Sequence, residues 1–169
     1  MRVLSEWTIS PDKCYFASML NEFLNSKLVQ RLDPSPEINL FIRSVCQEVS
    51  ADVGLAETTL EQAFLARMRS GAVSTPEGVA FLHAVVVGAK QTVVGCCVMP
   101  KGLLLDYTNP PADIIFTLVG NSATPWQHVR LLARLSRIAS DAETRKRLKS
   151  AATGADLLAA LLEEDKRHG

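Results

Sequence analysis

The stretch VAFLH at residues 79–83 is a run of four apolar residues that closes on a histidine. Two further runs, residues 92–98 and 112–119, are apolar along most of their length. Strands that alternate apolar with polar residues have one solvated face, whereas continuously apolar strands are usually covered on both faces. The three runs therefore predict strands of a buried sheet, and residues 28–32 add a short fourth strand.

Helix signals lie between and beyond these strands. Ser35 suits an N-cap position, and Gly54 marks the end of the helix that follows it. Thr58 and Glu61 have the spacing of a capping box, which predicts a second helix. In the C-terminal third, helix starts are predicted by three further signals, namely Thr124-Pro125, Asp141 and Thr153-x-x-Asp156.

Helices on both sides of buried strands predict an α/β fold, a three-layer sandwich whose mixed, mostly buried sheet is flanked by helices. The length suits a single domain over residues 1–169. Within it we expect an N-terminal leader at residues 1–27 with one helix, and a core at residues 28–165.

Composition excludes several classes of function. The 18 basic and 18 acidic residues cancel, which argues against nucleic acid as a partner. No apolar stretch is long enough to span a bilayer and no signal peptide opens the chain, so we expect a cytoplasmic protein without membrane insertion. The cysteines lack the spacing of a metal site or a redox pair, so we expect reduced, buried thiols and neither metal nor cofactor; they are Cys14, Cys46, Cys96 and Cys97.

Two of the three histidines lie where anions are commonly bound. His83 closes a predicted strand, and ligand sites in α/β sheets collect at strand ends. His128 lies within about one turn of a helix start, where unpaired N–H groups and the helix dipole favour an anion. That position lowers the pKa of an imidazole, so a neutral His128 could donate a hydrogen bond to a phosphoryl oxygen.

Three more side chains complete a possible phosphate site. Arg69 ends a predicted helix, and its guanidinium could reach phosphoryl oxygens with a fork of donors. Arg67, two residues earlier, is expected to face elsewhere. Ser74 and Thr75 could donate hydroxyls to the same anion. The simpler alternatives remain open, with Arg69 as a partner of the helix dipole and Ser74 as a turn former.

These residues resemble a known pattern. Arg69, Ser74-Thr75 and the segment GVAFLH at residues 78–83 are similar to the phosphorylation region of the enzyme IIA domains of the fructose/mannitol class. These domains belong to the bacterial phosphoenolpyruvate-dependent phosphotransferase system, and the class includes the nitrogen-regulatory IIA proteins. The segments DIIFTL at residues 113–118 and HVRLLARL at residues 128–135 also resemble the class.

The resemblance implies a phosphotransferase that forms a phosphohistidine intermediate. His83 would be the phosphoryl acceptor, with His128 and Arg69 as further catalytic residues and Thr75 and Ser74 as phosphate ligands. A phosphohistidine carrier of the HPr type would donate the group. An enzyme IIB domain or a regulatory target would receive it, in sugar uptake or in nitrogen and potassium regulation.

The chain also departs from the pattern of the class. Leu82 stands where the class has a proline before the histidine, and Ser70 stands where it has a glutamate. These differences leave an alternative of another kind, a non-catalytic IIA-like module that binds a partner and regulates it. Phosphorylation of His83 distinguishes the two.

Overall fold

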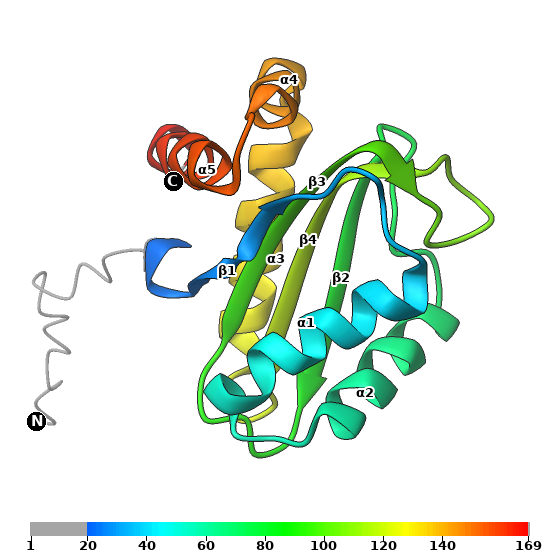
Figure 1. The fold of residues 1–169 in the computed structure, drawn as a ribbon. Helices are drawn as coiled ribbons and strands as arrows, with labels where there is room; N and C mark the ends of the chain where they lie inside the picture. The colour runs from blue at the N-terminus through cyan, green and yellow to red at the C-terminus, as the bar shows by residue number, and fades with distance from the viewer. Residues whose placement is uncertain (1–19, 169) are drawn as a thin grey trace, which may run out of the picture.

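The structure, a computed structural model, describes residues 20–168. Five α-helices and four strands form three layers in the described part of the chain (Figure 1). In chain order the elements are η1 (Leu20–Glu22), β1 (Leu24–Arg31), α1 (Ile38–Val53), α2 (Glu57–Arg69), β2 (Val79–Val86), β3 (Val93–Leu103), β4 (Ala112–Asn121), α3 (Pro125–Ser140), α4 (Ala142–Ser150) and α5 (Gly154–His168).

The sheet is mixed, as predicted, with the strand order β1-β3-β4-β2. β1 runs parallel to β3 and β2 runs parallel to β4, while β3 and β4 form an antiparallel pair. β2 lies at one edge of the sheet. The segment before it pairs with its first half, since Phe81 N donates to Val73 O at 2.8 Å and Thr75 N donates to Val79 O at 2.7 Å.

The prediction of strands covered on both faces is confirmed. Along β2, Ala80 and Leu82 pack with the apolar side chains of α1 and α2, while Val79 and Phe81 pack with those of the C-terminal helices. Figure 1 shows α1 and α2 in front of the sheet and α3 crossing behind it. A side chain at an odd-numbered position of β2 therefore points toward the layer that contains α3.

The ends of the helices follow the sequence signals in part. Gly54 ends α1 with φ of 69°, a left-handed conformation that favours glycine. The expected N-cap at Ser35 is wrong, because α1 begins at Ile38 after Glu37, whose carboxylate accepts from Asn39 N. The predicted N-cap at Thr58 is also wrong, since α2 begins at Glu57.

The sequence signals correctly predict where the C-terminal helices begin. α3 begins at Pro125, as predicted. Asp141 caps α4 by accepting from Thr144 N. Thr153 and Asp156 form a reciprocal pair at the start of α5, in which each side chain accepts from the backbone N–H of the other.

The expected division at residue 28 is wrong, because β1 starts at Leu24 and pairs there with Val94 of β3. Most of the helix predicted in the leader falls on residues 1–19, outside the described residues. Of the rest, residues 20–22 form a short 3-10 helix, and Leu20 N donates to Asp165 Oδ2 at 2.9 Å. The core therefore begins earlier in the chain than residue 28.

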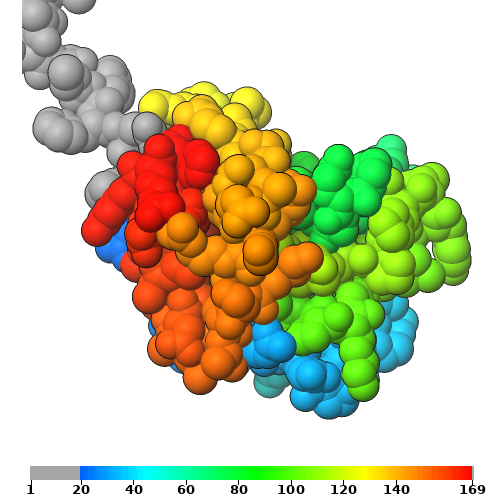
Figure 2. Space-filling model, turned by 90° about the horizontal axis from the view of Figure 1, so that it is seen from above, coloured from blue at the N-terminus to red at the C-terminus, as the bar shows by residue number. Residues whose placement is uncertain are grey.

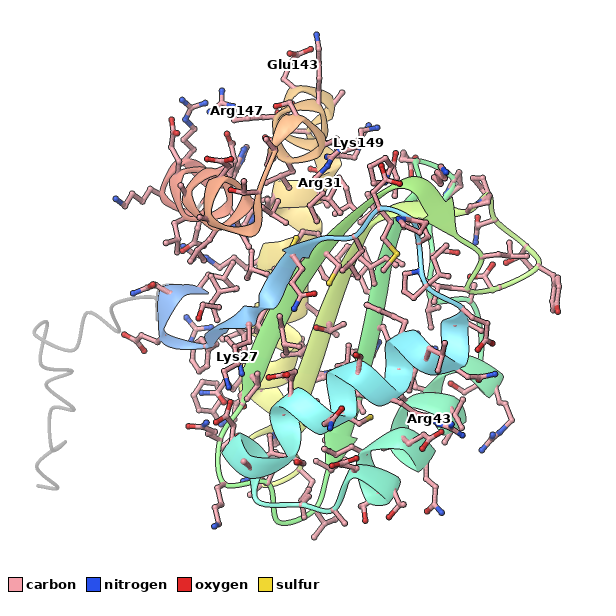
Figure 3. The ribbon with its side chains drawn as sticks, in the orientation of Figure 1. Lys27, Arg31, Arg43, Glu143, Arg147 and Lys149 are labelled. Carbon is pink, nitrogen blue, oxygen red and sulfur yellow. The ribbon has the colours of Figure 1, made fainter. Side chains whose placement is uncertain are left out.

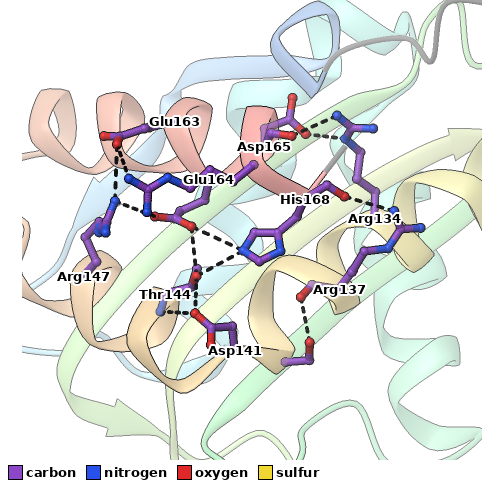
Figure 4. A network of polar contacts seen from close by, with 11 residues as sticks. Arg134, Arg137, Asp141, Thr144, Arg147, Glu163, Glu164, Asp165 and His168 are labelled. Carbon is purple, nitrogen blue, oxygen red and sulfur yellow. Dashed lines mark hydrogen bonds and ion pairs between the residues drawn. The ribbon is translucent and has the colours of Figure 1, made fainter.

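A polar network joins the three C-terminal helices (Figure 4). Asp165 and Arg134 form a buried ion pair, with only 2% and 12% of their side chains exposed. Glu164 is also buried; it pairs with Arg147 at 2.8 Å and accepts from Thr144 Oγ1 at 2.9 Å. The network holds α4 against α5, and Figure 2 shows the two helices packed side by side in orange and red.

The same helices are tied to the edge strand β1. One terminal nitrogen of Arg31 donates to Lys149 O at 3.0 Å and to Ala151 O at 3.1 Å. Figure 3 shows Arg31 beside Lys149 at the end of α4. The edge opposite to β2 is thereby connected to the helical layer that packs behind the sheet.

Candidate functional site

His83 lies inside β2 rather than at its end. The strand continues to Val86, and His83 pairs with Leu118 of β4. The prediction from the sequence ended the strand too early, because the apolar run continues through Ala84 and Val85. His83 occupies an odd-numbered position, so its partly buried ring points toward α3.

His128 is buried in the first turn of α3, with only 5% of its surface exposed. Its Nε2 lies 3.0 Å from Nδ1 of His83, and the two ring centroids are 5.1 Å apart. The structure therefore brings together two histidines that are 45 positions apart in the sequence.

The arginine at this site is Arg67, not Arg69. Arg67 Nε donates to His83 Nε2 at 3.0 Å, whereas Arg69 is exposed at the end of α2. Two residues on a helix differ by about 200° in direction, so only one of the two can face the sheet. Arg67 follows the buried Leu60 and Phe64 at helical spacing, and this apolar stripe was the signal that could have identified it.

The guanidinium of Arg67 is held by backbone carbonyls rather than by a carboxylate. One terminal nitrogen donates to Gly71 O at 3.2 Å, and the other donates to Ala72 O at 3.4 Å. No ion pair engages Arg67 within residues 20–168. Its positive charge is therefore not neutralised by an acidic neighbour.

These contacts fix the tautomers of both rings. Arginine can only donate, so Nε2 of His83 must accept and carries a lone pair. The proton of a neutral His83 is then on Nδ1, which donates to Nε2 of His128. His128 in turn carries its proton on Nδ1, a buried atom that has no hydrogen-bond partner within the described residues.

Both imidazoles are neutral near pH 7. Burial, the nearby charge of Arg67 and the contact with His128 lower the pKa of His83 from 6.5 to about 4. Burial also lowers the pKa of His128. A neutral ring with one unprotonated nitrogen is the form of histidine that acts as a nucleophile.

The arrangement differs from one expectation about His128. Its Nε2 faces His83 and accepts from it, so this nitrogen is not free to donate to a phosphoryl oxygen. His128 therefore contacts His83 directly and fixes the orientation of that ring.

The two predicted hydroxyl donors are engaged elsewhere. Ser74 Oγ donates to Asp106 Oδ2 at 2.5 Å. Thr75 Oγ1 accepts from Val79 N at 3.4 Å and makes a side-chain hydrogen bond with Glu77. Within residues 20–168, no hydrogen bond joins either hydroxyl to His83 or His128. The geometry brings together His83, His128 and Arg67, and it does not bring Ser74, Thr75 or Arg69 to them.

No group of three metal-binding side chains occurs within the described residues. The three cysteines in this part of the chain are buried and free; they are Cys46, Cys96 and Cys97. Burial raises the pKa of Cys46 and of Cys97 to about 12, which keeps both as unreactive thiols. Cys14 lies outside the described residues. Over residues 20–168, none of the helices has the length and apolar character that a bilayer span requires.

The sequence model of one family matches residues 22–164, and its description is the phosphoenolpyruvate-dependent sugar phosphotransferase system, EIIA 2. The chain belongs to this family. The phosphotransferase-system IIA class named from the sequence is thereby confirmed, and its domains belong to the phosphoenolpyruvate-dependent sugar phosphotransferase system. No curated protein matches the chain in sequence.

Solved IIA structures share the fold. The chain is similar to the nitrogen regulatory protein IIA-Ntr from Neisseria meningitidis, with a TM-score of 0.76 and 19% identity over 84% of this chain and 98% of that one. It is similar to IIA mannitol from Escherichia coli, with a TM-score of 0.62 and 18% identity over 79% and 96% of the two chains. It also resembles the IIA mannitol domain in a complex with phosphorylated enzyme IIB mannitol from Escherichia coli, with a TM-score of 0.65 and 16% identity over 83% and 99% of the chains.

Proposed function

We propose that this IIA protein is a phosphoryl carrier that accepts phosphate on Nε2 of His83. The donor is a phosphohistidine carrier of the HPr type, and the acceptor is an enzyme IIB domain or a regulatory target protein. One observation carries the proposal. The ring proton of His83 is on Nδ1, where His128 accepts its hydrogen bond, and this leaves Nε2 as the nitrogen that carries the lone pair.

The transfer exchanges one phosphorus–nitrogen bond for another. The lone pair of His83 Nε2 forms the new bond, and the electron pair of the broken bond stays on the donor's ring nitrogen. Positive charge develops on the His83 ring as the bond forms. His128 Nε2, 3.0 Å from Nδ1, stabilises that charge by accepting the hydrogen bond, and can take the proton.

Arg67 must move in this step before its charge can assist the transfer. Its Nε–H group covers the lone pair of His83, so it must move aside before the phosphorus atom arrives. The carbonyls of Gly71 and Ala72 keep the guanidinium beside the site, where its charge can stabilise the phosphoryl oxygens. Arg67 thus takes over the role first proposed for Arg69.

The surface around the histidines suits a protein partner. Val129 and Trp126, neighbours three positions apart on α3, are 64% and 55% exposed. Val85 is 45% exposed, two residues beyond His83 on the same face of β2. Gln127 accepts a hydrogen bond from Thr92, which directly precedes β3. Val129 projects from the opposite side of His128 on α3, so it is directed toward β2. Exposed apolar side chains near the histidine pair favour docking of a carrier domain over capture of a free small molecule.

The physiological setting belongs to the same proposal. We place the protein in the cytoplasm, where it serves sugar uptake through a IIB domain or regulates nitrogen and potassium metabolism. The alternative is a IIA-like interaction module without phosphoryl transfer. One observation favours that alternative, namely the guanidinium that covers the acceptor nitrogen. In such a module Arg67 would remain on His83.

The test is direct. The protein is incubated with phosphoenolpyruvate, enzyme I and an HPr-type or nitrogen-branch carrier, and the product is examined for acid-labile phosphate. ³¹P–¹⁵N NMR should place the phosphoryl group on Nε2 of His83, and His83→Ala should not be labelled. Labelling that persists in His83→Ala would reject the assignment, and absence of labelling with every carrier would favour the interaction module.

A further inference from the structure

The loop between β3 and β4 contains a carboxylate with an unusual number of hydrogen bonds. Asp106 Oδ2 accepts from Ser74 Oγ at 2.5 Å, from Ser74 N at 3.0 Å and from Val73 N at 3.2 Å. Its Oδ1 accepts from Thr108 Oγ1 at 2.8 Å and from Thr108 N and Asn109 N, both at 3.1 Å. One oxygen thus binds the segment after α2, and the other organises its own loop.

A second contact strengthens the link. Asn109 Nδ2 donates to Ser74 O at 2.9 Å, so the loop holds both the N–H group and the carbonyl of Ser74. Burial acts to raise the pKa of Asp106, but the hydrogen bonds from Ser74 and Thr108 outweigh it and hold this pKa well below its usual range. The carboxylate is therefore charged throughout the physiological range, and its hydrogen bonds are of the stronger, charge-assisted kind.

The segment that Asp106 binds is the one that holds Arg67. The carbonyls of Gly71 and Ala72, which accept from the guanidinium, directly precede Val73. A carbonyl oxygen carries no net charge, so it attracts a guanidinium only over the short range of a hydrogen bond. The position of the Arg67 guanidinium therefore depends on where these two carbonyls lie. Any shift of residues 71–74 would therefore shift the guanidinium relative to His83.

We propose that Asp106 is a positioning residue, which fixes the segment at residues 71–74 so that the guanidinium of Arg67 is held beside His83. The inference rests on the proposed function for its consequence in catalysis. The effect of Asp106 on the contact between Arg67 and His83 can be measured without any phosphoryl donor.

The experiment compares Asp106→Ala with Asp156→Ala. Asp156 makes similar hydrogen bonds to Thr153 N and Thr153 Oγ1 at the start of α5, and none of them involves Arg67 or His83. Arg67→Gln serves as the reference for complete loss of the guanidinium. The first readout is an NMR titration of the imidazole of His83, and the second is the kinetics of phosphoryl transfer from the phosphorylated carrier.

Loss of the nearby charge should raise the pKa of His83 in Arg67→Gln by about one unit or more. Asp106→Ala should move it in the same direction by a large part of that shift, and Asp156→Ala should leave it unchanged. In the kinetics, Asp106→Ala should lower kcat roughly tenfold, because the guanidinium is misplaced, while KM for the carrier stays constant.

Two milder variants keep the inference testable if Asp106→Ala does not fold. Asp106→Asn retains one acceptor oxygen, and Ser74→Ala removes one hydroxyl donor, so both should give smaller shifts in the same direction. A pKa of His83 that moves in Arg67→Gln but not in the folded variants at Asp106 or Ser74 would overturn the proposal. If the wild type accepts no phosphate, the proposed function fails, and the NMR titration still decides the role of Asp106.

Discussion

Gly120 of β4 lies directly beneath the ring of His128. A Cβ atom added at Gly120 would stand 2.4 Å from Nδ1 of His128, closer than packed atoms allow. Because Gly120 has no side chain, the imidazole of His128 can lie close to β4, where its Nε2 contacts His83. A glycine without unusual backbone angles is required here by close approach and not by conformation.

Gly120→Ala should displace His128 and break its contact with His83. We expect phosphoryl acceptance to slow by about ten- to a hundredfold, since a shift near 1 Å in a reacting group has effects of this size. Gly95→Ala is a suitable control, because its Cβ would crowd Thr117 and Leu28 in the same sheet but neither histidine. Transfer rates measured below the melting temperature of both variants should fall only for Gly120→Ala, and equal rates would contradict the role given to His128.

Arg67 and Arg69 offer a matched pair of substitutions. Arg67→Gln should slow phosphoryl transfer by roughly a hundredfold, the typical effect of removing one preorganised donor from a developing charge. Arg69→Gln should change the rate less than twofold, because Arg69 is exposed at the end of α2. Both rates are obtained from labelling with phosphorylated carrier, and a larger loss in Arg69→Gln would restore the role inferred from the sequence.

The contrast between these two arginines shows what the sequence could and could not predict. Continuous apolar runs revealed the strands, because burial on both faces leaves no polar alternation. The class resemblance identified His83 and His128, and the fold brings them together. The choice between Arg67 and Arg69 depended on the rotational phase of α2, which the buried Leu60 and Phe64 indicate only when they are used as a stripe.

The contacts of Asp106 were still harder to predict from the sequence. It contacts Val73 and Ser74 from 33 and 32 positions away, and no spacing rule connects a loop aspartate with a distant turn. The sequence around it, with Thr108 and Asn109, is typical of a side chain that caps its own turn. The local pattern therefore accounts for one carboxylate oxygen, and only the tertiary fold accounts for the other.

The low pKa of His83 predicts an unusual pH dependence. A histidine with an ordinary pKa of 6.5 would lose roughly nine-tenths of its reactive neutral form at pH 5.5. Because burial and Arg67 lower the pKa of His83 to about 4, the rate of acceptance should stay nearly constant from pH 8 to pH 5.5. An NMR titration of His83 checks the cause, and a midpoint near 6.5 would contradict it.

The same shift affects stability. Between pH 6.5 and pH 4 the unfolded chain binds a proton at this histidine that the folded chain does not bind. The free energy of unfolding should therefore fall as the pH is lowered from about 6.5 through about 4, and remain unaffected by His83 at higher pH. In His83→Gln, urea titrations over this range should show a weaker pH dependence than the wild type; an identical dependence would argue against the shift.

The buried pair of Asp165 and Arg134 predicts a large effect on stability and none on the site. Asp165→Ala leaves the guanidinium of Arg134 buried without its partner and removes the acceptor of Leu20 N, so we expect a loss of about 3–5 kcal/mol. Glu163→Ala is the control on the same helix, because its contacts with Arg167 at 2.8 Å and with Arg147 at 3.4 Å join partly exposed side chains and should each contribute less than about 1 kcal/mol. Urea unfolding measures both variants.

None of the hydrogen bonds found for Asp165 within residues 20–168 reaches His83, His128 or Arg67, so the folded Asp165→Ala protein should accept phosphate at the wild-type rate. A slower rate in the folded variant would show that the C-terminal network also supports the histidine pair.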